Sequence, residues 1–297
     1  PHATSLRMGR LGYQSDAQAS LAVSYNGLEG YANSLHEALT QPYPAYEAVG
    51  VRNPGGDYNQ LATSLLQIEN EFYGTIRPKR TVRTGERPLH ALRERGVEYV
   101  EVRLMDLDPF ESVGIAAQTM RFLDVFLLHC LLSDSPPDTP AEIAQIKHNQ
   151  HLTAERGREP GLTLQRQGQP VALATWGADI LAECAPLAAA LDAAHATDAY
   201  SVALQAAQAR LAQPESTPSA RVLQEMAAQG NSFNAFALQQ SVRARDALLQ
   251  QPWPAVQQQH FEALARESIA AQKAIEAADT LAFEDWRQRY VAVEELG

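Results

Sequence analysis

The first third of the chain alternates apolar and polar residues with the two-residue period of an extended strand. In GVEYVEVR, residues 96–103, one face carries Tyr99, Glu101 and Arg103, and the other carries valines that continue to Leu104. The stretches SLAVSY (20–25) and SLLQIENEFY (64–73) have the same two-sided pattern, and NPGGDY (53–58) predicts a tight turn or short loop. We therefore expect strands up to about residue 112, with their apolar faces against a core.

The spacing becomes helical from about residue 113. Apolar residues recur every three or four positions in 114–132, and the proline-rich SDSPPDTP (133–140) should end that helix. Ala-, Gln- and Leu-rich stretches separated by prolines predict further helices at 178–212, 219–229, 232–250 and 255–279. The pattern predicts an α+β protein with antiparallel strands and one long helix in residues 1–135 and a helical region packing on the sheet in 136–297.

Composition narrows the partners and the compartment. The 24 Lys and Arg against 35 Asp and Glu give a net charge of −11, which argues against general nucleic-acid or anionic-membrane binding. No apolar run reaches the roughly 20 residues of a membrane helix. The 2 cysteines, Cys130 and Cys184, are far apart and form no CxxC pair, which fits a reducing cytoplasm. The chain begins without Met close to a strand-like stretch, so we expect that it was cut from a longer one.

Candidate chemistry gathers in two places. Glu101 and Arg103 share the polar face of one strand, where either a cross-strand ion pair or a metal and phosphate site is possible. The segment 74–96, here called the basic segment, concentrates cations that would suit a polyanion such as a triphosphate, although a solvated loop would have the same composition. Its cations are Arg77, Lys79, Arg80, Arg83, Arg87, Arg93 and Arg95.

Other signals are weaker. Glu69 and Glu71 either pair with the basic segment or act in catalysis. His148 and His151 form a metal-ligand pair or, more simply, a surface pair. The sequence contains no GxxxxGK[ST], GxGxxG, HExxH or GxSxG motif, so common nucleotide and hydrolase sites have no support.

Four blocks resemble the bacterial (gammaproteobacterial) class of glutamate-cysteine ligase, in the family's order and spacing. They are ATSLRMGRLGY (3–13), LQIENEFYGTIRPKR (66–80), GVEYVEVRLMDLDPF (96–110) and RFLDVFLLHCLLSDSP (121–136). Weaker similarity continues in EPGLTL (159–164) and EAAD (276–279). The resemblance implies an incomplete glutamine-synthetase-like antiparallel sheet followed by helices. It also implies ATP-dependent joining of the γ-carboxylate of L-glutamate to L-cysteine, the first step of glutathione synthesis, through γ-glutamyl phosphate.

The resemblance also implies roles for individual residues. Glu101 matches a magnesium ligand, with Mn²⁺ as an alternative ion, and Arg103 matches a contact to the transferred phosphoryl group. Arg7 resembles the arginine that binds glutamate or the acyl phosphate, so both arginines are candidate catalytic residues. Tyr13 and Tyr73 resemble the tyrosines that bind the carboxylate of cysteine. Arg77 and Lys79 are expected at the phosphates of ATP, mainly because of their charge.

The family has an additional N-terminal region with most of its metal-binding glutamates, a His ligand and part of the nucleotide site, which this chain does not resemble. We therefore expect a C-terminal part of the ligase that is inactive without its N-terminal half. One alternative is a non-catalytic regulatory or interaction module derived from the same fold. A second is an ATP-grasp or glutamine-synthetase-like ligase with another amine acceptor.

Overall fold

Prolines and threonines mark where several helices begin. Thr139 Oγ1 accepts a hydrogen bond of 3.2 Å from the backbone N–H of Glu142, and Pro140 occupies the first turn of α5 (Pro140–Arg156). Thr217 caps α8 (Pro218–Ala227) in the same way, again with proline in the first turn. Prolines lie at helix ends in 133–140, 213–219 and 251–254, as expected. Pro186 instead lies inside the helix Leu173–His195, and the break at 196–198 within the predicted stretch 178–212 contains no proline.

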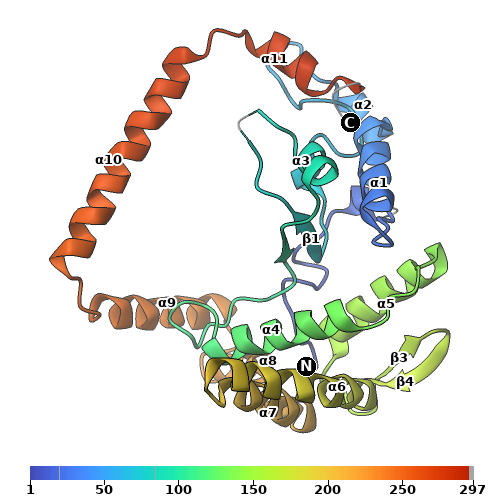
Figure 1. Ribbon diagram of the computed structural model, residues 1–297, viewed down its shortest axis with the longest axis vertical. Helices are drawn as coiled ribbons and strands as arrows, with labels where there is room; N and C mark the ends of the chain where they lie inside the picture. Colours follow the sequence, from blue (N-terminus) through green and yellow to red (C-terminus); the bar gives the residue numbers. More distant parts are fainter. Residues whose placement is uncertain (20, 84, 294–297) are drawn as a thin grey trace. The chain divides into compact units, whose positions relative to one another are not determined.

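The computed structural model describes residues 1–19, 21–83 and 85–293 (Figure 1). Helices make up most of the regular structure. Besides α5 and α8 they are α1 (Leu28–Thr40), α2 (Pro44–Val49), α3 (Pro88–Arg95), α4 (Ala117–Leu132), α6 (Leu173–His195), α7 (Ala199–Ala212), α9 (Phe233–Leu249), α10 (Ala255–Ala278) and α11 (Phe283–Tyr290). Short 3-10 helices are η1 (Asp16–Gln18), η2 (Glu69–Glu71) and η3 (Pro214–Ser216).

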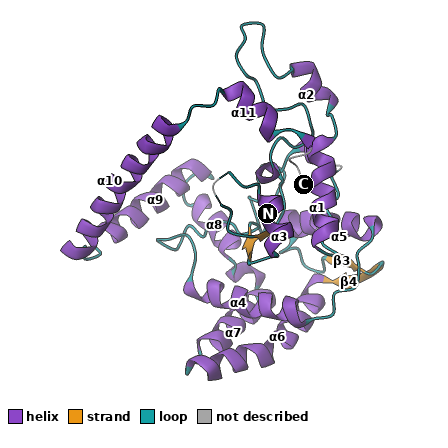
Figure 2. Ribbon diagram, turned by 45° about the horizontal axis from the view of Figure 1, so that its top comes forward, coloured by secondary structure: helices purple, strands orange, loops and turns teal. Residues whose placement is uncertain are grey.

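The strands of the described residues are short, as Figure 2 shows. Strand β1 (Ile76–Lys79) pairs with β2 (Tyr99–Val102), and β3 (Thr163–Arg166) pairs antiparallel with β4 (Gln169–Ala172). Helices combined with small antiparallel sheets confirm the α+β prediction. The β3–β4 hairpin was not predicted from the sequence.

Two predicted strands are wrong. Residues 21–25 form no regular strand, and Ser20, the first residue of that stretch, lies outside the described residues. In 64–73 the chain turns through η2, and the backbone N–H of Gln67 donates to the Glu71 side chain at 2.7 Å instead of to a neighbouring strand. Local side-chain acceptors therefore replace the ladder that the alternation predicted.

The strand predicted in 96–103 forms as β2, but its apolar face is not buried as expected. Val100 is 44% exposed and Leu104 is 42% exposed, so the expectation of a covered face is wrong for both. The described part of the chain gives β2 one strand partner, and a two-stranded sheet covers little of its own surface.

The chain divides into two compact units that alternate along the sequence. Unit 1 comprises residues 1–31, 73–77 and 100–245, and unit 2 comprises residues 32–72, 78–99 and 246–297. The domain boundary that the sequence predicts at residue 135 stays a prediction. Every residue predicted at the substrates except Lys79 falls within unit 1.

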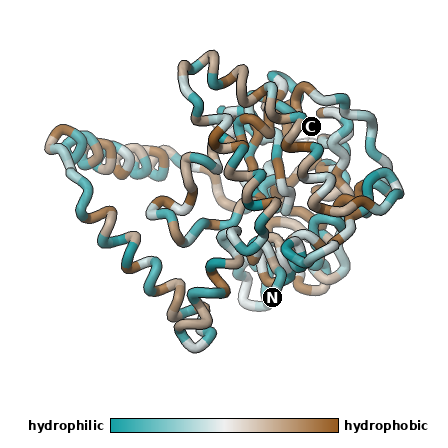
Figure 3. Tube along the Cα trace, turned by 90° about the horizontal axis from the view of Figure 1, so that it is seen from below, coloured by the Kyte–Doolittle hydropathy of each residue, from teal (hydrophilic) through white to brown (hydrophobic). Residues whose placement is uncertain are grey.

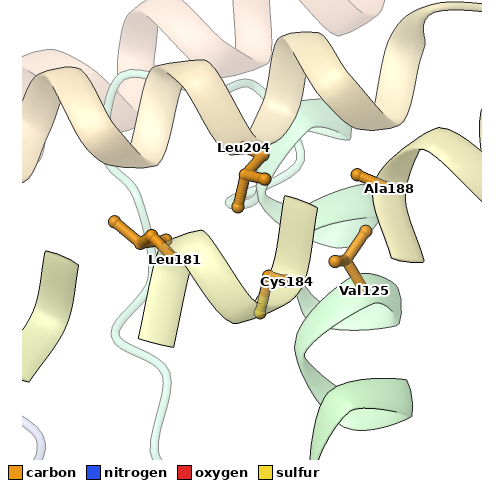
Figure 4. Close-up of a cluster of buried hydrophobic side chains, with 5 residues drawn as sticks. All are labelled: Val125, Leu181, Cys184, Ala188 and Leu204. Atoms are coloured by element: carbon orange, nitrogen blue, oxygen red, sulfur yellow. The ribbon is translucent and has the colours of Figure 1, made fainter. Parts of the chain in front are cut away.

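The core of unit 1 lies where α4, α6 and α7 pack together (Figure 4). It contains Val125 from α4, Leu204 from α7, and Leu181, Cys184 and Ala188 from α6. Cys184 is fully buried, and burial raises the pKa of its thiol. This cysteine behaves as a small apolar core residue.

Unit 2 contains a buried ion pair. Arg87 donates to both carboxylate oxygens of Glu69, at 3.0 and 2.9 Å, and both side chains are 5% exposed. The guanidinium carbon of Arg87 also lies 4.3 Å from the centroid of the Tyr290 ring, which fixes the end of α11. Glu69 therefore pairs with the basic segment, one of the two roles that the sequence left open.

Helix α10 has no buried residue, and Val256, Phe261 and Ile275 on it are at least half exposed. Figure 3 shows hydrophobic positions spread along the chain beside hydrophilic ones. None of the helices in the described ranges is both long and apolar enough to cross a membrane.

Candidate active site

Tyr13 lies at the centre of a group of aromatic and cationic side chains in unit 1. The guanidinium carbons of Arg7 and Arg103 lie 4.5 and 5.1 Å from the centroid of its ring. The ring of Tyr73 lies 4.5 Å away, centroid to centroid, and is tilted by 41°. Nη2 of Arg77 donates to the Tyr13 hydroxyl at 3.1 Å. We call Arg7, Tyr13, Tyr73, Arg77 and Arg103 the tyrosine–arginine cluster.

Backbone pairing brings three of these residues together. The N–H of Arg103 donates to the carbonyl of Thr75 at 2.8 Å, which extends the β1–β2 pairing and places Arg103 beside the chain that carries Tyr73 and Arg77. The N–H of Tyr73 donates to the side chain of Gln18 at 3.0 Å. Tyr73 and Arg77 belong to the ligase-like block 66–80, and Arg103 belongs to the block 96–110. Strand pairing thus fixes where these three residues lie in the cluster.

Arg7 and Tyr13 come from a turn near the start of the chain. The N–H of Tyr13 donates to the carbonyl of Arg7 at 2.5 Å, which closes the turn. Nε of Arg7 donates to the carbonyl oxygen of Arg103. This bond orients the Arg7 guanidinium, and its Nη1 and Nη2 atoms have no hydrogen-bond acceptor among the described residues.

The cluster has a buried side, formed by Arg77, and a solvent-accessible rim, formed by Tyr73 and Arg103. The Arg77 residue is 4% exposed, and Tyr13 is half-buried. Tyr73 is 43% exposed, and the Arg103 side chain is 27% exposed. Ligand atoms can therefore reach the rim, while the buried guanidinium of Arg77 fixes the Tyr13 hydroxyl.

Glu101 and Arg103 form an ion pair on β2, with Nη1 of Arg103 3.2 Å from Oε1 of Glu101. The pair confirms that the two side chains share one face, as residues two apart on a strand must. Three guanidinium groups, of Arg7, Arg77 and Arg103, contact Tyr13, so the surroundings of this ring favour an anion. Nε of Arg103 is buried and has no hydrogen-bond partner among the described residues.

The described residues do not form a metal centre by themselves. They contain no group of three or more His, Cys, Asp or Glu side chains placed to hold an ion. Glu101 alone offers one carboxylate, whereas Mg²⁺ takes six oxygen ligands. His148 and His151 lie on α5 and belong to no such group of three or more ligands in the described part of the chain.

The basic segment is more structured than a solvated loop. Arg77 and Arg87 are buried, so that interpretation is wrong for both. Arg95 binds Glu86 through two contacts, at 2.6 and 2.7 Å. Lys79 ends β1 and belongs to unit 2.

Sequence reasoning missed Asp106, whose carboxylate accepts hydrogen bonds from the backbone N–H groups of Leu6 and Arg7 at 3.0 and 2.9 Å. It also missed Gln18, which holds the backbone of Tyr73. Both contacts join distant parts of the chain, so spacing along the sequence could not reveal them. The position of Asp106 inside a ligase-like block was the available signal.

Comparison with known proteins identifies the family. The family model described as glutamate-cysteine ligase matches residues 1–153, more than half of the chain. The chain belongs to the glutamate-cysteine ligase family. A glutamate-cysteine ligase from Azotobacter vinelandii is 49% identical over 98% of this chain and 55% of its own length. One from Pseudomonas entomophila is 49% identical over 93% of this chain and 52% of its own length.

A solved ligase structure agrees with the fold. The crystal structure of glutamate-cysteine ligase from Francisella tularensis in complex with AMP superposes with a TM-score of 0.89 and 34% identity, covering 98% of this chain and 57% of that one. The chain thus spans about half the length of the ligases that it matches. The resemblance found from the four sequence blocks is confirmed.

Proposed function

We propose that this chain forms part of an ATP-dependent ligase that joins the γ-carboxylate of L-glutamate to the amine of L-cysteine. A γ-carboxylate oxygen attacks the terminal phosphorus of ATP, and ADP leaves. The cysteine nitrogen then attacks the acyl carbon of γ-glutamyl phosphate, loses a proton and expels phosphate. Phosphorylation is needed because a carboxylate is a poor electrophile without a leaving group.

One observation carries the proposal: two guanidinium groups flank the Tyr13 ring in a member of the glutamate-cysteine ligase family. Both groups keep N–H donors that have no acceptor among the described residues. Such donors bind carboxylate and phosphate oxygens in pairs. We assign Arg103 to the transferred phosphoryl group and Arg7 to glutamate or the acyl phosphate.

Tyr13 and Tyr73 would bind the carboxylate of cysteine. Their rings are in contact, and Tyr73 reaches the accessible rim. The Tyr73 hydroxyl has no partner within the described part of the chain, which leaves it as a donor for a carboxylate. Arg77 then acts by holding the Tyr13 hydroxyl. The contacts that we expect from Arg77 and Lys79 to the phosphates of ATP remain predictions.

Magnesium would neutralise charge on the phosphates when bound. Glu101 would supply one of its oxygen ligands, and the others would come from phosphate, water and residues outside this chain. Because the chain spans about half of its relatives, we propose that it is inactive alone and acts with the remaining part of the ligase, in the cytoplasm.

The test combines this chain with the part of the Azotobacter vinelandii ligase that it does not match. Phosphate release and formation of γ-glutamylcysteine are measured with ATP, glutamate and cysteine. We expect product only when both polypeptides and all three substrates are present. A mixture that never forms product would contradict the proposal and favour a non-catalytic module, and turnover by this chain alone would contradict its inactivity. Turnover with other amines in place of cysteine would favour a ligase of different acceptor specificity.

A further inference from the structure

The segment that carries Arg7 is fixed at its upstream end by α5. The N–H of Thr4 donates to the carbonyl of Ala154 at 2.8 Å, and Thr4 Oγ1 donates to the carbonyl of Thr153 at 2.6 Å. Nε of Arg158 donates to the carbonyl of Ala3 at 3.3 Å. The N–H of Ser5 also donates to the carbonyl of Ala154, at 3.3 Å, and α5 next contacts the turn at Arg10, whose Nε donates to Oε1 of Glu155 at 2.8 Å. The backbone of Leu6 and Arg7, between these contacts, is held by another group.

Asp106 holds that turn. Its Oδ1 accepts the N–H groups of Leu6 and Arg7, at 3.0 and 2.9 Å, and its Oδ2 accepts the hydroxyl of Ser5. Ser5 Oγ in turn accepts the N–H of Met8 at 2.9 Å. One carboxylate therefore organises the backbone on both sides of Arg7, and hydrogen bonds to a charged acceptor are the stronger kind.

The same short stretch also holds the Arg7 side chain. Arg103 lies three residues before Asp106, and its carbonyl oxygen accepts Nε of Arg7. The chain from Arg103 to Asp106 thus contacts both the backbone and the guanidinium of Arg7. Any shift of Asp106 would change the placement of Arg7 relative to Arg103.

We propose that Asp106 is a positioning residue that sets Arg7 against Arg103 and so determines how well the site uses glutamate. Asp106 touches no substrate in this account; it acts through Arg7. The inference rests on the proposed function, because glutamate use is its kinetic consequence. Misplacing a binding group by about 1 Å can cost about 100-fold in rate.

The kinetic test uses the combined enzyme and three variants. Asp106→Ala removes every acceptor, and we expect kcat/KM for glutamate to fall about 10- to 100-fold, with the KM for cysteine nearly unchanged. Asp106→Asn keeps one carbonyl oxygen for the two N–H groups, so it should recover most of the loss. Asp134→Asn, an exposed aspartate between α4 and α5, is the matched control and should behave as wild type.

A second measurement does not depend on turnover. In hydrogen exchange on this chain, Asp106→Ala should speed exchange of the Leu6 and Arg7 amides about tenfold or more, while the Thr4 amide, bonded to Ala154, keeps its wild-type rate. If Asp106→Ala does not fold, Asp106→Asn replaces it in the test, and we expect a smaller loss of kcat/KM that affects glutamate alone.

The outcomes separate the two ideas. An inactive wild-type mixture overturns the proposed function, and hydrogen exchange still tests how Asp106 holds the turn. An active wild type with an unchanged Asp106→Ala variant overturns the inference alone. An equal loss of kcat/KM for glutamate, cysteine and ATP also overturns it, because that result indicates general damage.

Discussion

Nη2 of Arg77 donates a hydrogen bond of 3.1 Å to the hydroxyl of Tyr13, from a residue that is only 4% exposed. A buried guanidinium thus fixes one end of a ring whose face two other arginines approach. The arrangement separates two kinds of cation in the cluster. Arg77 holds the tyrosine, whereas Arg7 and Arg103 keep donors for a ligand.

Tyr13→Phe should weaken cysteine binding by the combined enzyme by about 0.5 to 3 kcal/mol, because a hydrogen bond to the carboxylate is lost. Glutamate and ATP should be nearly unaffected. The variant also removes one hydrogen bond from buried Arg77, so its melting temperature should fall. Tyr73→Phe is the comparison, since it should weaken cysteine binding without that loss of stability. Equal losses for all three substrates in the kinetics would favour a packing role for both tyrosines.

Arg7→Lys should impair turnover or the use of glutamate although the charge is kept. Lysine has no planar pair of donors and cannot reproduce the bond from Nε to the Arg103 carbonyl while also reaching a ligand. Steady-state kinetics of the combined enzyme measure the effect. Wild-type kinetics in this variant would remove Arg7 from the site.

Glu101→Gln should raise the Mg²⁺ requirement of the combined enzyme and lower activity roughly tenfold or more, by analogy with substitutions around metal sites. The amide keeps the shape of the side chain and loses its charge, so thermal melts should stay close to wild type. Metal titrations of turnover measure the effect. Normal Mg²⁺ dependence would contradict a metal-binding role for Glu101 and favour a structural role that includes its ion pair with Arg103.

The stability of unit 2 should depend on Glu86 in acid. Hydrogen bonds from Arg95 lower the pKa of this carboxyl from 4.5 to about 2. A group whose pKa is lowered on folding stabilises the protein above its unfolded pKa, and this contribution is lost as the pH falls from 4.5 toward about 2. Glu86→Gln should therefore lower the melting temperature at about pH 6 and lose that difference in strong acid.

Glu47→Gln is the control for the acid experiment, because Glu47 is an exposed carboxylate on α2 in the same unit. Its melting curves should follow wild type across the range. A constant difference in melting temperature between Glu86→Gln and wild type at every pH would contradict this prediction, because protonation of the Glu86 carboxyl would then have no effect on stability.

Many of the helices after residue 113 were predictable because their signals are local, whereas α1, α2 and α3 lie where strands were expected, so that expectation is wrong for these segments. Apolar spacing predicted α4, and prolines at the joints predicted where later helices begin. The strands were harder, since alternation alone does not say whether a partner strand exists. Residues 64–73 alternate as β2 does, yet their backbone bonds to Glu71 and turns through η2.

The β3–β4 hairpin shows the opposite failure. Its strands have four residues each, and the turn at Gln167 and Gly168 depends on positive φ angles of 51° and 77° that a Gln–Gly pair signals only weakly. Asp106 was missed for a different reason. Its bond to the N–H of Arg7 spans 99 residues, and a contact of that kind exists only in the folded chain.

The most direct measurement follows oxygen from glutamate during turnover. The combined enzyme receives glutamate labelled with ¹⁸O in its γ-carboxylate, together with ATP and cysteine, and the released phosphate is analysed by mass spectrometry. Formation of γ-glutamyl phosphate predicts one ¹⁸O in each phosphate, and Arg103→Ala should slow this transfer about 100- to 1,000-fold because charge stabilisation is lost. Unlabelled phosphate, or labelled phosphate formed at the wild-type rate by Arg103→Ala, would contradict the account.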